Sequence, residues 1–152
     1  MKIRLVCVGK FSNPHLEALA GDYRERLRRL CDLEIVEVKD ALAGDGEARL
    51  TKEAALILAK AGPLADCILW DENGEDMDSR AFSRFLERRE AATKRLTMII
   101  GSSHGIADSL KAAVPRKLRL SRFTFTHEWA RALALEQLYR AYCIKKNLPY
   151  HH

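Results

Sequence analysis

Short apolar segments alternate with longer segments of helical periodicity along this chain. The apolar segments, each expected to form a strand, cover residues 2–8, 33–38, 67–70, 96–100 and 117–120. The amphipathic segments, each expected to form a helix, cover residues 15–30, 47–61, 79–93, 108–114 and 127–146. Strands that alternate with helices of this length are joined by right-handed crossovers, which place the strands parallel in one sheet. The order therefore predicts an α/β domain with a parallel sheet between layers of helices.

Capping and turn residues set the expected ends of several elements. Ser79 is a candidate N-cap for the third helix, and Asp108 is a candidate cap for the fourth. Glycines at two positions predict a loop over residues 41–47, and the sequence Asp-Glu-Asn-Gly predicts a turn over residues 71–74. No repeat, linker or change of composition interrupts the chain, so residues 1–152 are expected to form a single domain.

Length and composition place the chain among soluble globular proteins. It has 152 residues, of which 47% are hydrophobic, and a chain of this length can bury enough surface to fold without metal or disulfide bonds. The longest stretch without Lys, Arg, Asp or Glu is the twelve residues 96–107, which is too short to span a bilayer. The first apolar run ends at Gly9 and Lys10, too early for a signal peptide. We therefore expect a cytoplasmic protein with no membrane partner.

Motif spacing gives no metal site and no standard nucleotide site. The four cysteines form no CxxC pair, so they are expected to be free thiols in a reducing compartment. His127 and Glu128 could begin a zinc-protease helix, but Arg131 stands where the second histidine is needed. No GxGxxG, P-loop or GxSxG sequence follows any expected strand. The prediction is a site that uses no metal.

Positive charge is concentrated in the C-terminal quarter of the chain. Residues 111–152 contain nine Lys or Arg and two acidic residues, a formal charge of +7, whereas the whole chain carries +5. Neutralising phosphates gives sequence-independent affinity, so this distribution fits a polyanionic partner. The alternative is a solvated helix face that only aids solubility, and charge alone does not separate the two.

Three expected strand ends carry residues suited to ligand binding. They are residues 70–74, 100–105 and 120–127. In an open parallel sheet, ligands bind beyond the carboxyl ends of the strands. Gly101 would let the backbone approach a ligand closely, and the hydroxyl of Ser102 could serve a polar group there. Gly101 could equally do no more than make a turn.

The last expected helix is apolar on almost every side except at Arg131. A helix that is hydrophobic all round is buried all round. A terminal helix normally covers one face of a sheet, so the remaining face is expected to meet a second copy of the chain, with Ala134 among the small residues at the contact. The sequence therefore predicts a homodimer.

The basic end also supplies candidate functional side chains. Arg140 stands one turn after Glu136, so its partner is either that carboxylate or an anionic ligand. Tyr150 could stack on a base, and His151 could hydrogen-bond a base or accept a proton. The alternative is that the two final histidines begin a purification tag or a frayed end. The end of the chain is expected to be mobile until RNA orders it.

Together these residues resemble a known family. Three segments are similar to the RlmH family of the SPOUT superfamily. They are residues 120–127, residues 127–144, which contain the sequence Leu-Glu-Gln-Leu-Tyr-Arg-Ala, and the final Pro-Tyr-His. This family comprises pseudouridine N3-methyltransferases of large-subunit ribosomal RNA. Residues 6–10, 71–74 and 100–101 fit the same family, so the resemblance covers the whole chain.

The resemblance implies a homodimer with a C-terminal trefoil knot that binds S-adenosylmethionine, and a substrate within large-subunit ribosomal RNA, most naturally in the assembled ribosome. The family's donor contacts correspond to Trp70, Gly101, Leu120, Ser121, Arg122, Phe123, Thr124 and Phe125. Its catalytic side chains correspond to His127, Arg140 and His151, and its RNA contacts to Arg140, Tyr150 and His151. The family usually has Leu at the position of Trp70 and a second glycine at that of Ser102.

Methyl transfer to a ring nitrogen fits these residues chemically. It needs positioned reactants, a dry pocket and an acceptor for the N3 proton, but no metal. Arg140 would favour the anion of the imide, and either His127 or His151 could take the proton. Two alternatives are a non-enzymatic ribosome-associated module that only binds RNA and a SPOUT enzyme that acts on transfer RNA.

Overall fold

The computed structural model describes residues 1–41 and 45–151. It contains a five-stranded sheet in the order β2-β1-β4-β3-β5, with every neighbouring pair parallel. The strands are β1 (Lys2–Val8), β2 (Asp32–Val38), β3 (Cys67–Glu75), β4 (Arg95–Ile100) and β5 (Arg116–Leu118). The predicted α/β class with a parallel sheet between helices is confirmed.

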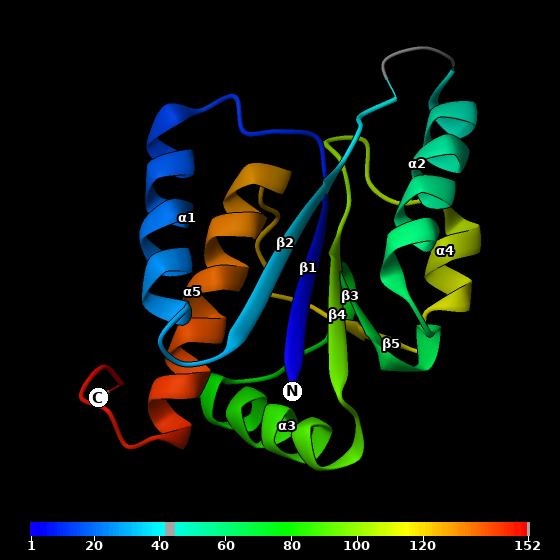
Figure 1. Cartoon of the computed structure of the whole chain (residues 1–152). Coiled ribbons are helices and arrows are strands. Elements are labelled where there is room, and N and C mark those ends of the chain that lie inside the picture. The colour runs from blue at the N-terminus through cyan, green and yellow to red at the C-terminus, as the bar shows by residue number, and fades with distance from the viewer. Residues whose placement is uncertain (42–44, 152) are drawn as a thin grey trace.

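Helices cover both faces of the sheet. They are α1 (Pro14–Leu27), α2 (Gly46–Ala61), α3 (Ser79–Ala92), α4 (Asp108–Ala113) and α5 (His127–Lys145), with a short 3-10 turn, η1 (Leu64–Asp66), before β3. Figure 1 shows α1 and α5 on one side of the sheet and α2 and α4 on the other. The buried side chains of α1, α3 and α5 form one hydrophobic cluster with the sheet, and those of α2 and α4 form a second. None of the helices within residues 1–41 and 45–151 is long and apolar enough to cross a membrane.

The two central strands explain why the sequence pattern predicted the sheet. β1 pairs with β2 from Lys2 opposite Asp32 onward and with β4 from Lys2 opposite Arg95 onward. Since β1 and β4 have helices on both faces, nearly all of their side chains are buried. Strands in that position are continuous apolar runs instead of alternating ones.

α5 owes its apolar character to its own chain. It packs against both α1 and α3 as well as the sheet, and Ala134 is fully buried inside the protomer. Two neighbouring helices cover the flanks of α5, so its all-round apolarity does not by itself require a second copy, and the homodimer stays a prediction. One stripe of α5 stays partly exposed and includes Trp129, Leu133 and Arg140.

Local details differ from the sequence predictions at several element ends. The N-cap of α3 is Asp78, whose side chain accepts from Ala81 N, so Ser79 is the first helical residue. Asp108 likewise begins α4 and does not cap it. The loop predicted over residues 41–47 lies partly outside the described residues, and its last two positions belong to α2.

The predicted turn at residues 71–74 is an excursion within β3. Trp70 and Glu75 both stand opposite Leu118 of β5, so the four residues between them bulge out of the ladder. Gly74 returns the chain, and a Cβ there would lie 2.5 Å from the Leu118 carbonyl carbon. This bulge sends Asp71 and Glu72 toward the carboxyl end of the sheet, where the candidate site lies.

Candidate active site

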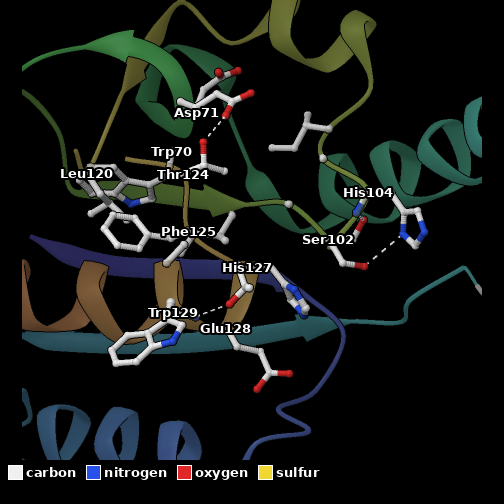
Figure 2. A pocket seen from close by; sticks show the side chains of 18 of the residues that line it. Trp70, Asp71, Ser102, His104, Leu120, Thr124, Phe125, His127, Glu128 and Trp129 are labelled. Carbon is white, nitrogen blue, oxygen red and sulfur yellow. Dashed lines mark hydrogen bonds between the residues drawn. The ribbon is translucent and has the colours of Figure 1, made fainter. Parts of the chain in front are cut away.

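A cavity of about 770 Å³ opens at the carboxyl ends of β3 and β4. Its other walls are the segment after β5, the first turn of α5 and the loop before α1. Figure 2 shows Trp70, Leu120 and Phe125 gathered at one end of the cavity, and Ser102 and His104 at the other. The cavity thus lies where a parallel sheet is expected to bind its ligand.

Most of the residues expected to contact a methyl donor line this cavity. They are Trp70, Gly101, Leu120, Ser121, Phe123, Thr124 and Phe125, and His127 lines it too. Arg122 is the exception, since its side chain is 81% exposed and pairs with Asp76 at 3.2 Å. Arg119 binds the same carboxylate, and these two arginines hold the pKa of Asp76 at about 2. Arg122 in this structure fastens the segment after β5 to the end of β3.

Two residues that line the cavity each have a buried side-chain nitrogen atom without a hydrogen-bond partner within the described residues. These atoms are Trp70 Nε1 and His127 Nδ1. A buried donor or acceptor without a partner costs free energy, so such atoms mark places where a ligand or solvent completes the bonding. The Trp70 ring is held in place by the edge of Phe82, with ring centroids 5.7 Å apart.

Gly101 is needed by the protein itself. A Cβ at this position would lie 2.4 Å from Ile106 Cγ1 and 2.5 Å from the Gly105 carbonyl oxygen. The close approach for which glycine was predicted is therefore to the following loop, which turns back at Gly105 with a φ of 94°. Gly101 thereby sets the position of the loop, residues 102–105, that forms one wall of the cavity.

The aromatic and acidic sides of the cavity come from different segments. Phe123 is 80% exposed, and Phe125 and Trp129 are partly exposed beside it. The Asp71 carboxylate lies 3.5 Å from Lys111 Nζ, and Glu72 accepts a hydrogen bond from Thr124 Oγ1 at 3.2 Å. Exposed aromatic rings in a mostly preformed cavity suit a flat heterocyclic ligand.

Sequence reasoning missed the wall formed by the loop before α1. Ser12 and Asn13 line the cavity and are held by Glu128 in the first turn of α5. Glu128 and Ser12 are 116 residues apart, and no local pattern connects them. The one signal in the sequence that could have indicated this contact is Glu128 itself, an acidic residue at the start of a largely apolar helix.

Arg140, Tyr150 and His151 form a separate cluster that does not line the cavity. Arg140 donates to Glu136 Oε1 from Nη2 at 2.6 Å, lies over the Tyr150 ring at 4.7 Å, and has its Nη1 3.4 Å from His151 Nδ1. The hydrogen bonds that Arg140 donates to the Glu136 carboxylate raise the pKa of Arg140. Arg140 comes thirteen residues after His127, which corresponds to about 20 Å along a helix. The structure brings the three predicted RNA contacts together, but away from the cavity of their own chain.

Tyr150 packs against its own chain, a set of contacts that the sequence did not predict. Its hydroxyl lies 3.0 Å from both Tyr23 Oη and Glu136 Oε1, and its ring meets the edge of Tyr139. Burial and these two hydrogen bonds raise the pKa of Tyr150. The end of the chain is thus docked on α1 and α5 as far as Tyr150.

Comparison with known proteins identifies the family. A family model described as "Predicted SPOUT methyltransferase" matches residues 1–151. The chain belongs to the SPOUT methyltransferase family. Among similar proteins is "Ribosomal RNA large subunit methyltransferase H" of Pelobacter propionicus, 37% identical over the full length of both chains. The protein of that name from Nitratidesulfovibrio vulgaris is 40% identical over 99% of this chain and 97% of its own.

In the part of the chain that the structure describes, no three His, Cys, Asp or Glu side chains gather so as to hold a metal ion. The use of no metal stays a prediction.

Proposed function

We propose that this protein methylates N3 of a pseudouridine in large-subunit ribosomal RNA, with S-adenosylmethionine as donor. The observation that carries the proposal is the cavity at the carboxyl end of the sheet, lined by seven of the eight residues matched to the family's donor contacts. The similarity over the full chain to proteins named for ribosomal RNA methylation supports the substrate. Residues 1–152 would form one domain, work in the cytoplasm on the assembled ribosome, and carry the trefoil knot of the superfamily.

The residues of the cavity fit such a donor. Trp70 Nε1 offers a buried donor without a partner, and the exposed rings of Phe123, Phe125 and Trp129 offer faces for an adenine or a sulfonium cation. Asp71 and Glu72 offer carboxylate oxygens for hydroxyl groups. When bound, the donor would supply a methyl group on a positively charged sulfur.

The remaining chemistry falls to the side chains of this chain. The cavity walls would hold the base in line and exclude water. His127, which lines the cavity, would accept the N3 proton, and His151 is the alternative acceptor if it reaches the cavity from another copy. Arg140 would stabilise the imide anion, since a nearby cation favours the charged form.

A second copy of the chain would complete this site. Arg140, Tyr150 and His151 lie outside the cavity of their own chain, whereas the partly exposed stripe of α5 runs from Trp129 at the cavity through Leu133 to Arg140. Pairing of this stripe with its counterpart in a two-fold dimer would bring the Arg140 cluster of one protomer to the cavity of the other. We therefore propose a homodimer with sites shared between protomers.

Leu133→Arg is expected to convert the dimer to monomers while keeping the fold. Leu133 is only partly buried in its own chain, so the charge becomes an unpaired buried group only in the dimer. Leu58→Arg is the matched control, because Leu58 is a 44% exposed leucine on α2, across the sheet. Light scattering at micromolar concentration measures both, and a monomeric wild-type protein would contradict the dimer.

Donor binding tests the proposed function directly. Calorimetry on chelator-treated protein is expected to show about one S-adenosylmethionine per cavity. Gly101→Ala is expected to weaken that binding at least tenfold, because its Cβ would displace Ile106 and the Gly105 carbonyl from the cavity wall. Gly21→Ala is the control, since a Cβ at this α1 position meets nothing within 4 Å. No heat at millimolar donor would remove the enzymatic proposal and leave an RNA-binding module.

The substrate is tested by methylation of RNA from a strain lacking this modification, mapped by mass. A single added methyl on a pseudouridine of large-subunit ribosomal RNA supports the proposal. Methylation confined to transfer RNA would place the protein with the SPOUT enzymes of that substrate class.

A further inference from the structure

Glu128 ties the loop before α1 to the first turn of α5. The carboxylate is buried, and it accepts hydrogen bonds from Ser12 N at 3.1 Å, Ser12 Oγ at 2.5 Å and Asn13 N at 3.0 Å. The hydrogen bond from the Ser12 hydroxyl, together with those from the backbone, holds the pKa of Glu128 below its usual range. Glu128 is therefore a carboxylate at neutral pH, and it can only accept.

Arg131 fixes the same loop one turn further along α5. Its side chain is 3% exposed, pairs with Glu37 at 2.5 Å, donates to the Gly9 carbonyl at 3.2 Å and lies 4.0 Å from the centre of the Phe11 ring. Two buried charged residues thus hold both ends of the segment from Gly9 to Asn13. The position of Ser12 on the cavity wall is set by this double attachment and not by the loop's own conformation.

The attachment determines what the Ser12 hydroxyl can offer to a ligand. A serine hydroxyl has one proton to donate and two lone pairs to accept with. The proton of Ser12 is committed to Glu128, and so is its backbone N–H. Ser12 is left with an acceptor oxygen.

Two other hydroxyls at the cavity are arranged the opposite way. Ser121 Oγ accepts from Phe123 N at 3.1 Å, and Thr126 Oγ1 accepts from Trp129 N at 3.4 Å, so their protons remain for a ligand. Thr124 also donates to a carboxylate, but at 3.2 Å and to the exposed Glu72. Ser12 differs from Ser121 and Thr126 because its hydroxyl proton is donated to a buried carboxylate.

We propose that Ser12 accepts a hydrogen bond from an N–H group of a molecule bound in the cavity, and that Glu128 is the positioning residue that restricts Ser12 to this role. The inference rests on the proposed use of the cavity for donor and base. Two N–H groups of the reactants have this chemistry: the α-ammonium of the donor's amino acid part and a ring N–H of the base. Both are donors, and both would be repelled by a hydroxyl that pointed its own proton at them.

Calorimetry and steady-state kinetics on Ser12→Ala, Ser12→Thr and Glu128→Gln test this role. Loss of one such hydrogen bond is expected to weaken the affected binding step about three- to tenfold in Ser12→Ala. Ser12→Thr keeps a hydroxyl and is expected to restore most of the affinity. Glu128→Gln is expected to weaken binding by at least as much as Ser12→Ala, because an amide cannot accept all three hydrogen bonds.

Ser79→Ala is the matched control. The Ser79 hydroxyl also donates to a side-chain oxygen, Gln137 Oε1 at 2.7 Å, but it lies outside the cavity. Its removal is expected to leave donor affinity and kinetics unchanged.

Comparing the Kd for the donor with the KM for RNA in Ser12→Ala identifies which N–H group Ser12 binds. If it is the α-ammonium, Ser12→Ala raises the donor Kd but not that of 5′-methylthioadenosine, which lacks the amino acid part. If it is the base, the donor Kd stays constant and the KM for RNA rises. Unchanged donor Kd and RNA KM in Ser12→Ala, with melting temperature preserved, would overturn the role of Ser12. Absence of donor binding by the wild-type protein would instead contradict the proposed function itself.

Discussion

Arg140→Ala is expected to keep the fold and donor affinity while lowering the rate of methylation by roughly a hundredfold or more. That range is typical of losing one charge-stabilising donor at a reacting centre. In its own chain Arg140 pairs with Glu136, one of the two partners that the sequence allowed, since Nε and Nη2 both donate to Glu136 Oε1. Its Nη1 points elsewhere, toward His151 Nδ1 at 3.4 Å. The guanidinium therefore keeps donors for an anion after Glu136 is satisfied.

The alternative for Arg140 makes a different prediction. A partly exposed helix pair at this spacing contributes about 0.3–0.5 kcal/mol, which would hardly change the melting temperature or the rate. Glu136→Gln is the matched variant, because it removes the pair and leaves Arg140 in place. Methylation mapped by mass, with melting temperature and donor calorimetry alongside, separates the two. Full activity in Arg140→Ala would assign Arg140 to the helix pair alone.

The architecture could be predicted because the burial of a strand or helix determines the pattern of apolar residues in its own sequence. β1 and β4 have neighbours on both faces, and after their first residues they are apolar except at Arg4 and Thr97, which indicates this directly. The carboxyl ends of the strands could be located in the same way. The sequence alone therefore predicts that Trp70, Gly101 and Leu120 lie at one edge of the sheet. The residues matched to the donor contacts of the family then proved to line one cavity, with Arg122 as the exception.

The missed features depend on contacts between distant segments. Ser12 reaches the cavity wall through Glu128, and Arg131 finds Glu37 and the Gly9 carbonyl, none of which is near in sequence. The burial of Ala134 could not be assigned to α1, α3 or a second copy from periodicity, because a pattern reports how much of a helix is covered and not what covers it. The hydrogen bond between Tyr150 and Tyr23 likewise joins segments that are distant in sequence.

Removal of the residues after Leu148 is expected to abolish methylation of ribosomal RNA, with dimerisation and donor affinity unchanged. The core clusters contain none of the removed residues among their buried members, so the fold should persist. The truncation releases Glu136 and Tyr23 from the Tyr150 hydroxyl, which should lower the melting temperature slightly. The effect on methylation should be much larger, because the cluster beside Arg140 would lose both Tyr150 and His151.

The docked position of Tyr150 is compatible with a role in binding RNA. One side of its ring is occupied by Arg140 at 4.7 Å, an interaction of about 0.5–1 kcal/mol at an exposed site. Stacking of a base on an aromatic ring contributes about 1–3 kcal/mol, so a base can displace the guanidinium, which then becomes available to the anion. Tyr150→Phe, which keeps the ring but not the hydroxyl, should therefore methylate far better than the truncated chain. Mass mapping of methylated RNA compares the wild-type protein, Tyr150→Phe and the truncated chain. A truncated chain with normal activity would show that the residues after Leu148 take no part in the reaction.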